Sequence, residues 1–264
     1  MLPSRLESLN QQGNFYLVPN PLFYKNVVPL STDTHKNLRF STQSQPLGFA
    51  KDANLIPALV DEFDLALDDL PIAFLPAADV PSAVFVTGLK PGTNVFISKE
   101  GLWDGKYAPA YLRRYPFIIG DVEGGEAILC VDDTYEGLSE DEGEPFFTET
   151  GESEETLLRA LTISQSYKTS ADRTDAFTKM VHEMGLFQSI SLDAVMPDGE
   201  KTSVHGLMVV NEQALSELSD AQLGKLNAAG FLKPIYSHLL SLRSISRLGQ
   251  QLDIPSVPVG ETVQ

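Results

Sequence analysis

The sequence predicts an α+β protein in which a mainly antiparallel β-sheet section precedes a largely helical section with one β-hairpin. Up to about residue 150, short apolar runs alternate with turn residues, and several neighbouring runs are separated by connections short enough for hairpins. Beyond that point, apolar residues recur at helical spacing over long stretches. We expect a flexible arm over residues 1–21, a mainly β section over 22–150, a mainly α section packed on it over 151–252 and a disordered tail over 253–264.

The first section is expected to contain strands and one helix. Strands are predicted over residues 24–30, 38–41, 72–75, 83–89, 95–98, 116–120 and 127–131, and residues 15–18 of the arm can add an edge strand. Turn residues at 90–93 and 123–125 suit hairpins that join the strands on either side. Asp52 or Asn54 is expected to cap a helix that has Pro57 in its first turn and lies on the sheet.

The second section is expected to be mostly helical. Helices are predicted over residues 154–184, 212–218, 220–229 and 234–252, and strands over 188–195 and 203–210. Four apolar residues from Phe177 to Met184 follow i, i+3, i+4, i+7 spacing, and Gly185 suits a C-terminal cap. We expect an interruption of this long helix near residues 169–172 and a hairpin turn at 197–200.

Charge and composition exclude several classes of protein. The formal net charge of −17 argues against a protein that binds nucleic acid or anionic membranes, because phosphate binding depends on clustered Lys and Arg. No apolar run approaches the roughly 20 residues that a membrane span needs, so a transporter permease is excluded. The N-terminus lacks the apolar core of a signal peptide, and the single cysteine, Cys130, is expected to be a small buried hydrophobe. We expect a soluble, cytoplasmic protein.

The aromatic and basic residues of this acidic chain gather in the run YAPAYLRRYPFIIGD, at residues 107–121. Pro109 suits the first turn of a short helix and Pro116 discourages its continuation, which predicts a helix feeding directly into a strand. Arg113 and Arg114 are adjacent, so they point in different directions from a helix, and one is expected inside the fold and the other outside. Such a pair can hold a carboxylate or phosphate of a ligand. The alternative, favoured by the many nearby acids, is an arginine tied to the protein's own carboxylates.

Six residues in or beside this run are the candidates for binding a partner or ligand: Trp103, Tyr107, Tyr111, Arg113, Arg114 and Tyr115. Aromatic and arginine side chains carry much of the binding energy at protein interfaces. The alternative is that the tyrosines are half-buried anchors and that Trp103 packs locally.

The sequence offers no recognisable catalytic, metal or cofactor motif. The four histidines are dispersed, and no H-E-x-x-H, C-x-x-C, G-x-S-x-G or G-x-G-x-x-G occurs. The acidic stretch 132–155 is expected to be a solvated loop; the less favoured alternative is a calcium site, which lacks here the order of ligands that an EF-hand needs. We expect no metal, no cofactor and no catalytic residue. The open alternative is an enzyme with His205 or His238 as acid or base, acting with Cys130 or on an anionic substrate held by an arginine.

Six segments form a pattern in a fixed order along the chain: VPLS at 28–31 with His35, PIAF at 71–74, YAPAYLRRYPF at 107–117, LCVDD at 129–133, GLMVVN at 206–211, and Tyr236, His238, Leu239, Ser241, Leu242 and Arg243. Together they resemble the SapC-like family of Gram-negative bacteria, over residues 22–248. The resemblance implies an association with surface-layer protein export. Relatives are often encoded near TonB-dependent receptors, flavin halogenase-like proteins and cupin-type or JmjC-like oxygenases. The resemblance therefore implies a partner rather than a reaction. The peptide-transporter permease of the same name is unrelated.

The leading expectation is a non-catalytic accessory protein that binds a partner protein or peptide, such as a cupin or JmjC-like oxygenase linked to nutrient uptake or surface-protein modification. The alternative is an enzyme or enzyme subunit that binds a small anionic substrate through Arg113 or Arg114. A structural role in the surface layer suits the family name but not the missing export signal.

Overall fold

A computed structural model describes residues 6–7, 16–17, 21–41, 47–77, 79–120, 127–195, 199, 201–248 and 251–253. Most of the predicted arm, nearly all of the predicted tail and the predicted turns at 123–125 and 197–200 lie outside these residues, apart from Gly199. Within the arm, β1 (Leu6–Glu7) pairs antiparallel with β2 (Tyr16–Leu17). The protein is α+β, as the sequence predicts.

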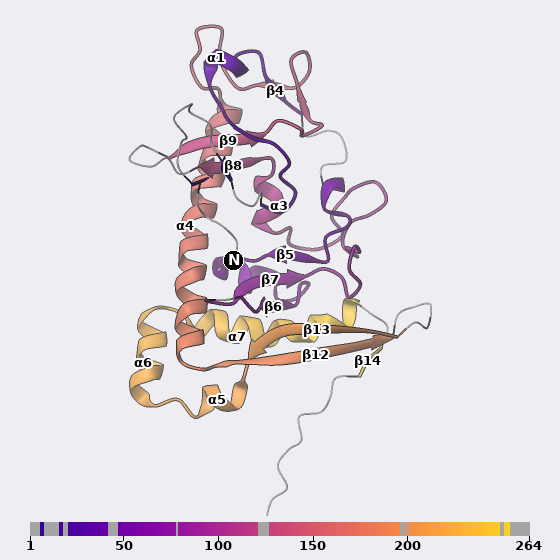
Figure 1. The fold of residues 1–264 in the computed structure, drawn as a ribbon, viewed down its shortest axis with the longest axis vertical. Coiled ribbons are helices and arrows are strands. Elements are labelled where there is room, and N and C mark those ends of the chain that lie inside the picture. Colours follow the sequence, from indigo (N-terminus) through magenta and orange to yellow (C-terminus); the bar gives the residue numbers. More distant parts are fainter. Residues whose placement is uncertain are drawn as a thin grey trace, which may run out of the picture.

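The larger sheet has six strands in the order β14-β12-β13-β6-β7-β5, with all neighbours antiparallel. The strands are β5 (Leu55–Pro57), β6 (Ile72–Leu75), β7 (Ser82–Val86), β12 (Phe187–Val195), β13 (Lys201–Val210) and β14 (Gln251–Asp253). The β12–β13 hairpin is the one expected in the second section. Because it pairs with β6, one sheet combines strands from both halves of the chain (Figure 1).

The backbone pairing between β13 and β6 is narrow, and side chains of the helix α7 (Leu232–Ser241) reinforce it. Only Met208 and Phe74 are in register across this junction. Nδ1 of His238 lies 3.0 Å from the Ile72 carbonyl on β6, and Nε2 accepts a hydrogen bond from the Val210 amide at the end of β13. These two contacts fix the neutral tautomer with the proton on Nδ1. A single imidazole therefore bridges the two halves of the sheet.

The smaller sheet lies at the other end of the molecule, and one long helix joins the two sheets. Its order is β3 (Val27–Pro29), β9 (Ile128–Asp132) and β8 (Phe117–Gly120). The helix α4 (Glu155–Glu183) runs along one side of the molecule from this sheet to the six-stranded sheet (Figure 1). It packs against α3 (Ala110–Arg114), β8, β7 and the short helix η2 (Val60–Glu62).

Short elements complete the described chain. They are α1 (Thr32–His35), β4 (Arg39–Phe40), η1 (Gly48–Ala50), α2 (Phe63–Ala66), β10 (Leu138–Ser139), β11 (Glu144–Pro145), α5 (Glu212–Ser216), α6 (Asp220–Ala228) and η3 (Leu242–Leu248). The strands β10, β4 and β11 form a further small sheet. No helix in the described segments combines the length and the apolar character needed to cross a bilayer.

The main core is aromatic and lies where α4 and α7 cover the six-stranded sheet. Phe177 on α4 is fully buried, and its ring centroid lies 5.9 Å from that of Phe63, 6.3 Å from that of Phe74 and 5.4 Å from that of Phe231. The apolar stripe that ends at Met184 is therefore core, as the helical spacing predicts. Gly185 ends α4 with a positive φ of 68°, the left-handed conformation of a C-terminal glycine cap.

Four predicted elements are corrected by the structure. Pro57 lies in β5 rather than in a helix, because residues 55–57 pair with β7, and the helical turns begin only at Val60. Residues 95–98 form no strand and make a single isolated bridge, from Ile97 to Trp103. The helix α4 continues without interruption through residues 169–172, and the last helix gives way to η3 and β14.

Candidate functional site

The site is organised around α3, whose two arginines point in opposite directions. Pro109 precedes the first helical residue and Pro116 follows the last turn, so the helix has only five residues. The exposed fraction of Arg114 is 8%, whereas the Arg113 side chain is 49% exposed. The expectation that one arginine lies inside the fold and the other outside is confirmed.

Arg113 is held at the surface by the protein's own groups. Its Nε donates to the Ala108 carbonyl over 3.0 Å, and a terminal nitrogen donates to the Tyr107 hydroxyl over 2.9 Å. That hydroxyl donates to the buried carboxylate of Glu62 over 2.7 Å, and the Ala110 amide donates to the same oxygen over 2.6 Å. Burial raises the pKa of Glu62, and these hydrogen bonds offset part of that effect. The interpretation as an arginine tied to internal acids applies to Arg113.

Arg114 has no such acid and is surrounded by tyrosine rings. Its guanidinium carbon lies 3.8 Å from the ring centroid of Tyr167, 4.6 Å from that of Tyr111 and 5.7 Å from that of Tyr24. Among the described residues no carboxylate forms an ion pair with it, and its buried Nε has no hydrogen-bond partner. A guanidinium offers five N–H donors. The three tyrosine rings and the nearby Tyr111 hydroxyl occupy only some of these donors.

The charge of Arg114 persists despite its burial. Burial lowers the pKa of the guanidinium, but the hydroxyls of the three surrounding tyrosines outweigh that effect, so the pKa lies above its ordinary value. Burial likewise raises the pKa values of Tyr24, Tyr111 and Tyr167, so all three are neutral near pH 7. The cluster therefore presents one buried positive charge and no negative charge of its own.

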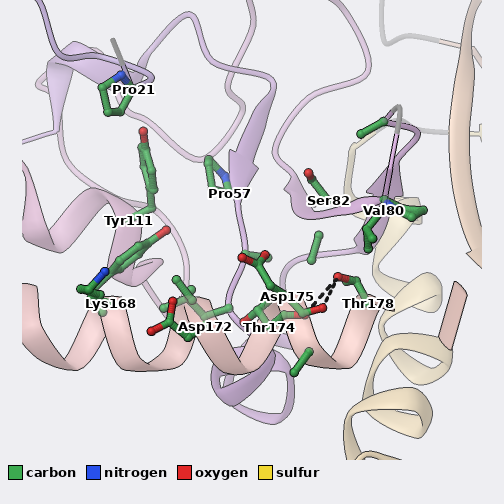
Figure 2. Close-up of a pocket in the computed structure, with 18 of the residues that line it drawn as sticks. Pro21, Pro57, Val80, Ser82, Tyr111, Lys168, Asp172, Thr174, Asp175 and Thr178 are labelled. Carbon is green, nitrogen blue, oxygen red and sulfur yellow. Dashed lines mark hydrogen bonds between the residues drawn. The ribbon is translucent and has the colours of Figure 1, made fainter. Parts of the chain in front are cut away.

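Arg114 lines a cavity of about 430 Å³ between α3, α4, β8 and the start of β7. Figure 2 shows Tyr111 towards one end of this cavity, Pro57 and Ser82 on one wall, and α4 as the opposite wall. Ser164, from α4, also lines it, and its buried Oγ makes no hydrogen bond to any described group. An arginine whose Nε has no hydrogen-bond partner and a serine whose hydroxyl has none thus lie in the wall of one cavity, an arrangement suited to an anionic oxygen.

Further along α4, acidic side chains line the cavity. Asp172 and Asp175 line it, and both are exposed. Burial and the neighbouring Asp172 raise the pKa of the Asp175 carboxyl above its ordinary value. Thr174, between them, is already occupied, because its hydroxyl donates to the Ser170 carbonyl and accepts from the Val60 amide.

The remaining predicted binding residues are used within the fold. The Trp103 ring stacks on Phe96 with centroids 5.2 Å apart. The Tyr111 hydroxyl donates to the Leu22 carbonyl over 3.0 Å, and the Tyr115 hydroxyl donates to the Asp132 carboxylate over 3.2 Å. The six candidates are therefore not one surface: Tyr111 and Arg114 line the cavity, whereas Tyr107, Arg113, Tyr115 and Trp103 lie elsewhere.

The residues considered for catalysis are not brought together. Cys130 is buried beside Tyr24 and Ile118, and burial raises its pKa to about 11. His205 is exposed and contacts Ser191, whereas His238 is buried at the junction of β6 and β13. None of these three residues lines the cavity. No group of three or more metal-binding side chains occurs among the described residues.

Sequence reasoning missed the contribution of α4 to the site. Ser164, Tyr167 and Asp175 were not candidates, yet they form the wall opposite α3. A signal was present in the sequence, because buried hydroxyl residues such as Thr174 and Thr178 share the helix face with apolar ones. A polar stripe within a buried helix face indicates either internal hydrogen bonds or a cavity.

Comparison with known proteins identifies the family. No curated protein and no solved structure matches the chain. The model of the SapC family matches residues 30–248, which is most of the sequence and includes α3, α4 and the whole described cavity wall except Pro21. The chain therefore belongs to the SapC family.

Proposed function

We propose that the protein is a binding protein that receives a carboxylate group of its ligand in the cavity between α3 and α4. One observation carries the proposal: Arg114 is charged, buried and faces a cavity, and no described carboxylate neutralises it. A buried charge without a partner is costly, so proteins pair such groups with an internal acid or with a ligand. The ligand's carboxylate would supply the missing partner.

A carboxylate fits this site better than a larger, more highly charged anion. One guanidinium and one serine hydroxyl match the two oxygens of a carboxylate, which arginine binds in a bidentate manner. The rings of Tyr111 and Tyr167 provide apolar surface for the part of the ligand next to that group. Phosphate groups are usually held by several cations or by backbone amides at a helix N-terminus. Lys168 and Lys179 also line this cavity, but of its three cations only Arg114 is buried.

Binding rather than catalysis is the role that the cavity supports. Its described lining contains no histidine and no cysteine, and His205 and His238 both lie outside it. The proposal is compatible with both expectations from the sequence, a protein or peptide partner and a small anionic ligand. The carboxylate can belong to a small molecule or to the C-terminal end of a partner's chain. We further propose that the protein is cytoplasmic and that its partner is an oxygenase.

The test is calorimetric titration of the protein with octanoate and with octanamide, which have the same chain but differ in charge. We expect octanoate to bind and octanamide to bind at least tenfold more weakly, since a charge-assisted hydrogen bond contributes about 1.5–3 kcal/mol. Equal binding of the two probes, or binding of neither, would overturn the proposal without any variant.

Two variants of neighbouring arginines give a matched control. Arg114→Met keeps the length and apolar stem of the side chain but removes its charge, and we expect it to lose the preference for octanoate. Arg113→Met on the same helix changes a side chain outside the cavity and is expected to retain that preference. Circular dichroism checks that both variants fold, and Arg114→Lys, which keeps the charge but not the bidentate geometry, gives an intermediate affinity.

A further inference from the structure

The cavity lies along the open edge of β8. Among the described strands, β8 pairs with β9 on one side and with no strand on the other. Ile118 and Ile119 both line the cavity. Because successive side chains of a strand point to opposite faces of the sheet, a cavity that both residues border lies beside the strand rather than over one face. The cavity therefore borders the backbone of β8 as well as its side chains.

Ile119 directs its backbone polar groups towards this open edge. In an antiparallel pair the residues of a strand alternate, so that every second residue turns its amide and carbonyl away from the neighbouring strand. The Asp132 amide of β9 donates to the Pro116 carbonyl, so Pro116 faces β9. Phe117 faces the other way, and its carbonyl accepts from the Tyr24 hydroxyl over 2.6 Å. Ile119, two residues further on, therefore also faces away from β9, and no described group forms a hydrogen bond with its amide or carbonyl.

The strand on the opposite wall of the cavity does not offer such an edge. β5 is the edge strand of the six-stranded sheet, and its last residue, Pro57, lines the cavity. A proline has no amide proton, so this position can accept a hydrogen bond from an added chain but cannot donate one. Where the two strands border the cavity, β8 is therefore the one that presents both a donor and an acceptor.

Resting on the proposed carboxylate site, we infer that the ligand is the C-terminal segment of a partner polypeptide, which adds a strand to the open edge of β8. The terminal carboxylate meets Arg114 and Ser164, and the backbone of the segment pairs with Ile119. A polypeptide supplies the amides and carbonyls that an open strand edge can bind, whereas an acyl chain supplies none. The cavity volume of about 430 Å³ lies in the range of ligand pockets, about 300–1,000 Å³.

The position of Arg114 sets the direction of the added strand. Its guanidinium carbon lies 5.7 Å from the ring centroid of Tyr24, whose hydroxyl reaches the Phe117 carbonyl, so the positive charge lies at the start of β8. Ile119 lies two residues, about 7 Å, further along the strand. A chain that ends at Arg114 and whose preceding residues lie beside Ile119 runs antiparallel to β8. The third residue from its end is then opposite Ile119, and the two residues exchange both of their backbone hydrogen bonds.

The experiment compares the peptide acetyl-Ala-Val-Ala-Val, which has a free carboxylate, with octanoate in calorimetric titrations. We expect the peptide to bind at least about tenfold more tightly than octanoate, because backbone hydrogen bonds add to the carboxylate contact. The same peptide with a C-terminal amide should bind at least about tenfold more weakly than the free acid.

Methylation of single backbone nitrogens in the peptide tests the pairing with β8. A methyl group on the third residue from the end removes the donor to the Ile119 carbonyl, and we expect it to weaken binding at least about fivefold. The matched control carries the methyl group one residue later, on an amide that points away from β8. We expect this control peptide to bind within about twofold of the unmethylated one.

Hydrogen exchange of the protein's own amides gives a second readout. Binding of the free-acid peptide should slow exchange of the Ile119 amide at least about tenfold, because the amide gains a hydrogen-bond partner. The Ile118 amide faces Cys130 on β9 in both states and serves as the control. Equal protection of both amides, or of neither, contradicts the assigned edge.

The outcomes separate this inference from the proposal on which it rests. If Arg114→Met binds octanoate as well as the unmodified protein does, the proposed function itself fails. If octanoate binds through Arg114 but the peptide binds no more tightly, or the two methylated peptides bind alike, the carboxylate site stands. The strand addition is then wrong, and the ligand is a small molecule.

Discussion

Protonation of His238 is expected to destabilise the protein between about pH 6.5 and pH 4. The imidazole accepts from the Val210 amide and donates to the Ile72 carbonyl, so it is needed in its neutral form. Burial lowers its pKa from 6.5 to about 4. Because the pKa is lower in the folded than in the unfolded state, the stabilisation is fully present above pH 6.5 and is lost as the pH falls towards 4.

The size of the effect follows from the two pKa values. A difference of about 2.5 units corresponds to about 3 kcal/mol when the transition is complete, of which about 2 kcal/mol is lost between pH 7.5 and pH 5. Urea unfolding at pH 7.5, 6 and 5 measures this loss. His238→Gln lacks the titrating group, so its free energy of unfolding should fall by about 2 kcal/mol less than that of the unmodified protein over the same range.

A matched control is available in an exposed histidine. His205→Gln changes a histidine that is exposed at the surface, and we expect this variant to reproduce the pH dependence of the unmodified protein. An NMR titration of the His238 ring gives an independent measurement, since the ring should stay neutral down to pH 5. The reasoning is refuted if the ring titrates near pH 6.5, or if His238→Gln has the same pH dependence as the unmodified chain.

Two further predictions concern the cores. Phe177→Ala should lower the free energy of unfolding by about 3–5 kcal/mol in urea, because the fully buried ring contacts Phe63, Phe74 and Phe231 and its loss leaves a cavity; a loss below about 1 kcal/mol would contradict the assigned packing. The Cys130 thiol should react with a disulfide reagent at pH 8 at least about a hundredfold more slowly in the folded protein than in urea, because burial raises its pKa from 9.0 to about 11. Comparable rates in both conditions would show that the thiol is not buried.

Local patterns predicted the elements whose formation depends on nearby residues. The pair of prolines around α3 predicted a short helix running into β8, and helical spacing predicted a stripe of core residues on α4. The divergence of the two adjacent arginines could also be predicted, because it follows from the geometry of the helix alone. Which of them lies inside could not be predicted, because it depends on Tyr24 and Tyr167, which lie far from α3 in the sequence.

Two of the errors have their physical origin in long-range pairing of the backbone. The residues 55–57 look like the start of a helix, but they become a strand because β7 offers them a partner. Residues 95–98 have strand-like composition, but their backbone hydrogen bonds go to Thr87 on one side and to residues 102–104 on the other, so they form one isolated bridge and no strand. The cavity could not be predicted from the sequence, because Ser164 and Arg114 lie far apart along the chain and meet in one cavity wall only in the folded protein.

The narrow junction between β6 and β13 also bears on the order in which the chain can fold during synthesis. When the first half has left the ribosome, β6 can pair with β7, but its other edge has neither β13 nor the imidazole of α7. An open sheet edge of this kind is prone to pair with other chains. The edge lacks its strand partner until residues 201–210 have been made, and it lacks the imidazole until residue 238 has emerged. Severing the chain near residue 150 would make that temporary exposure permanent.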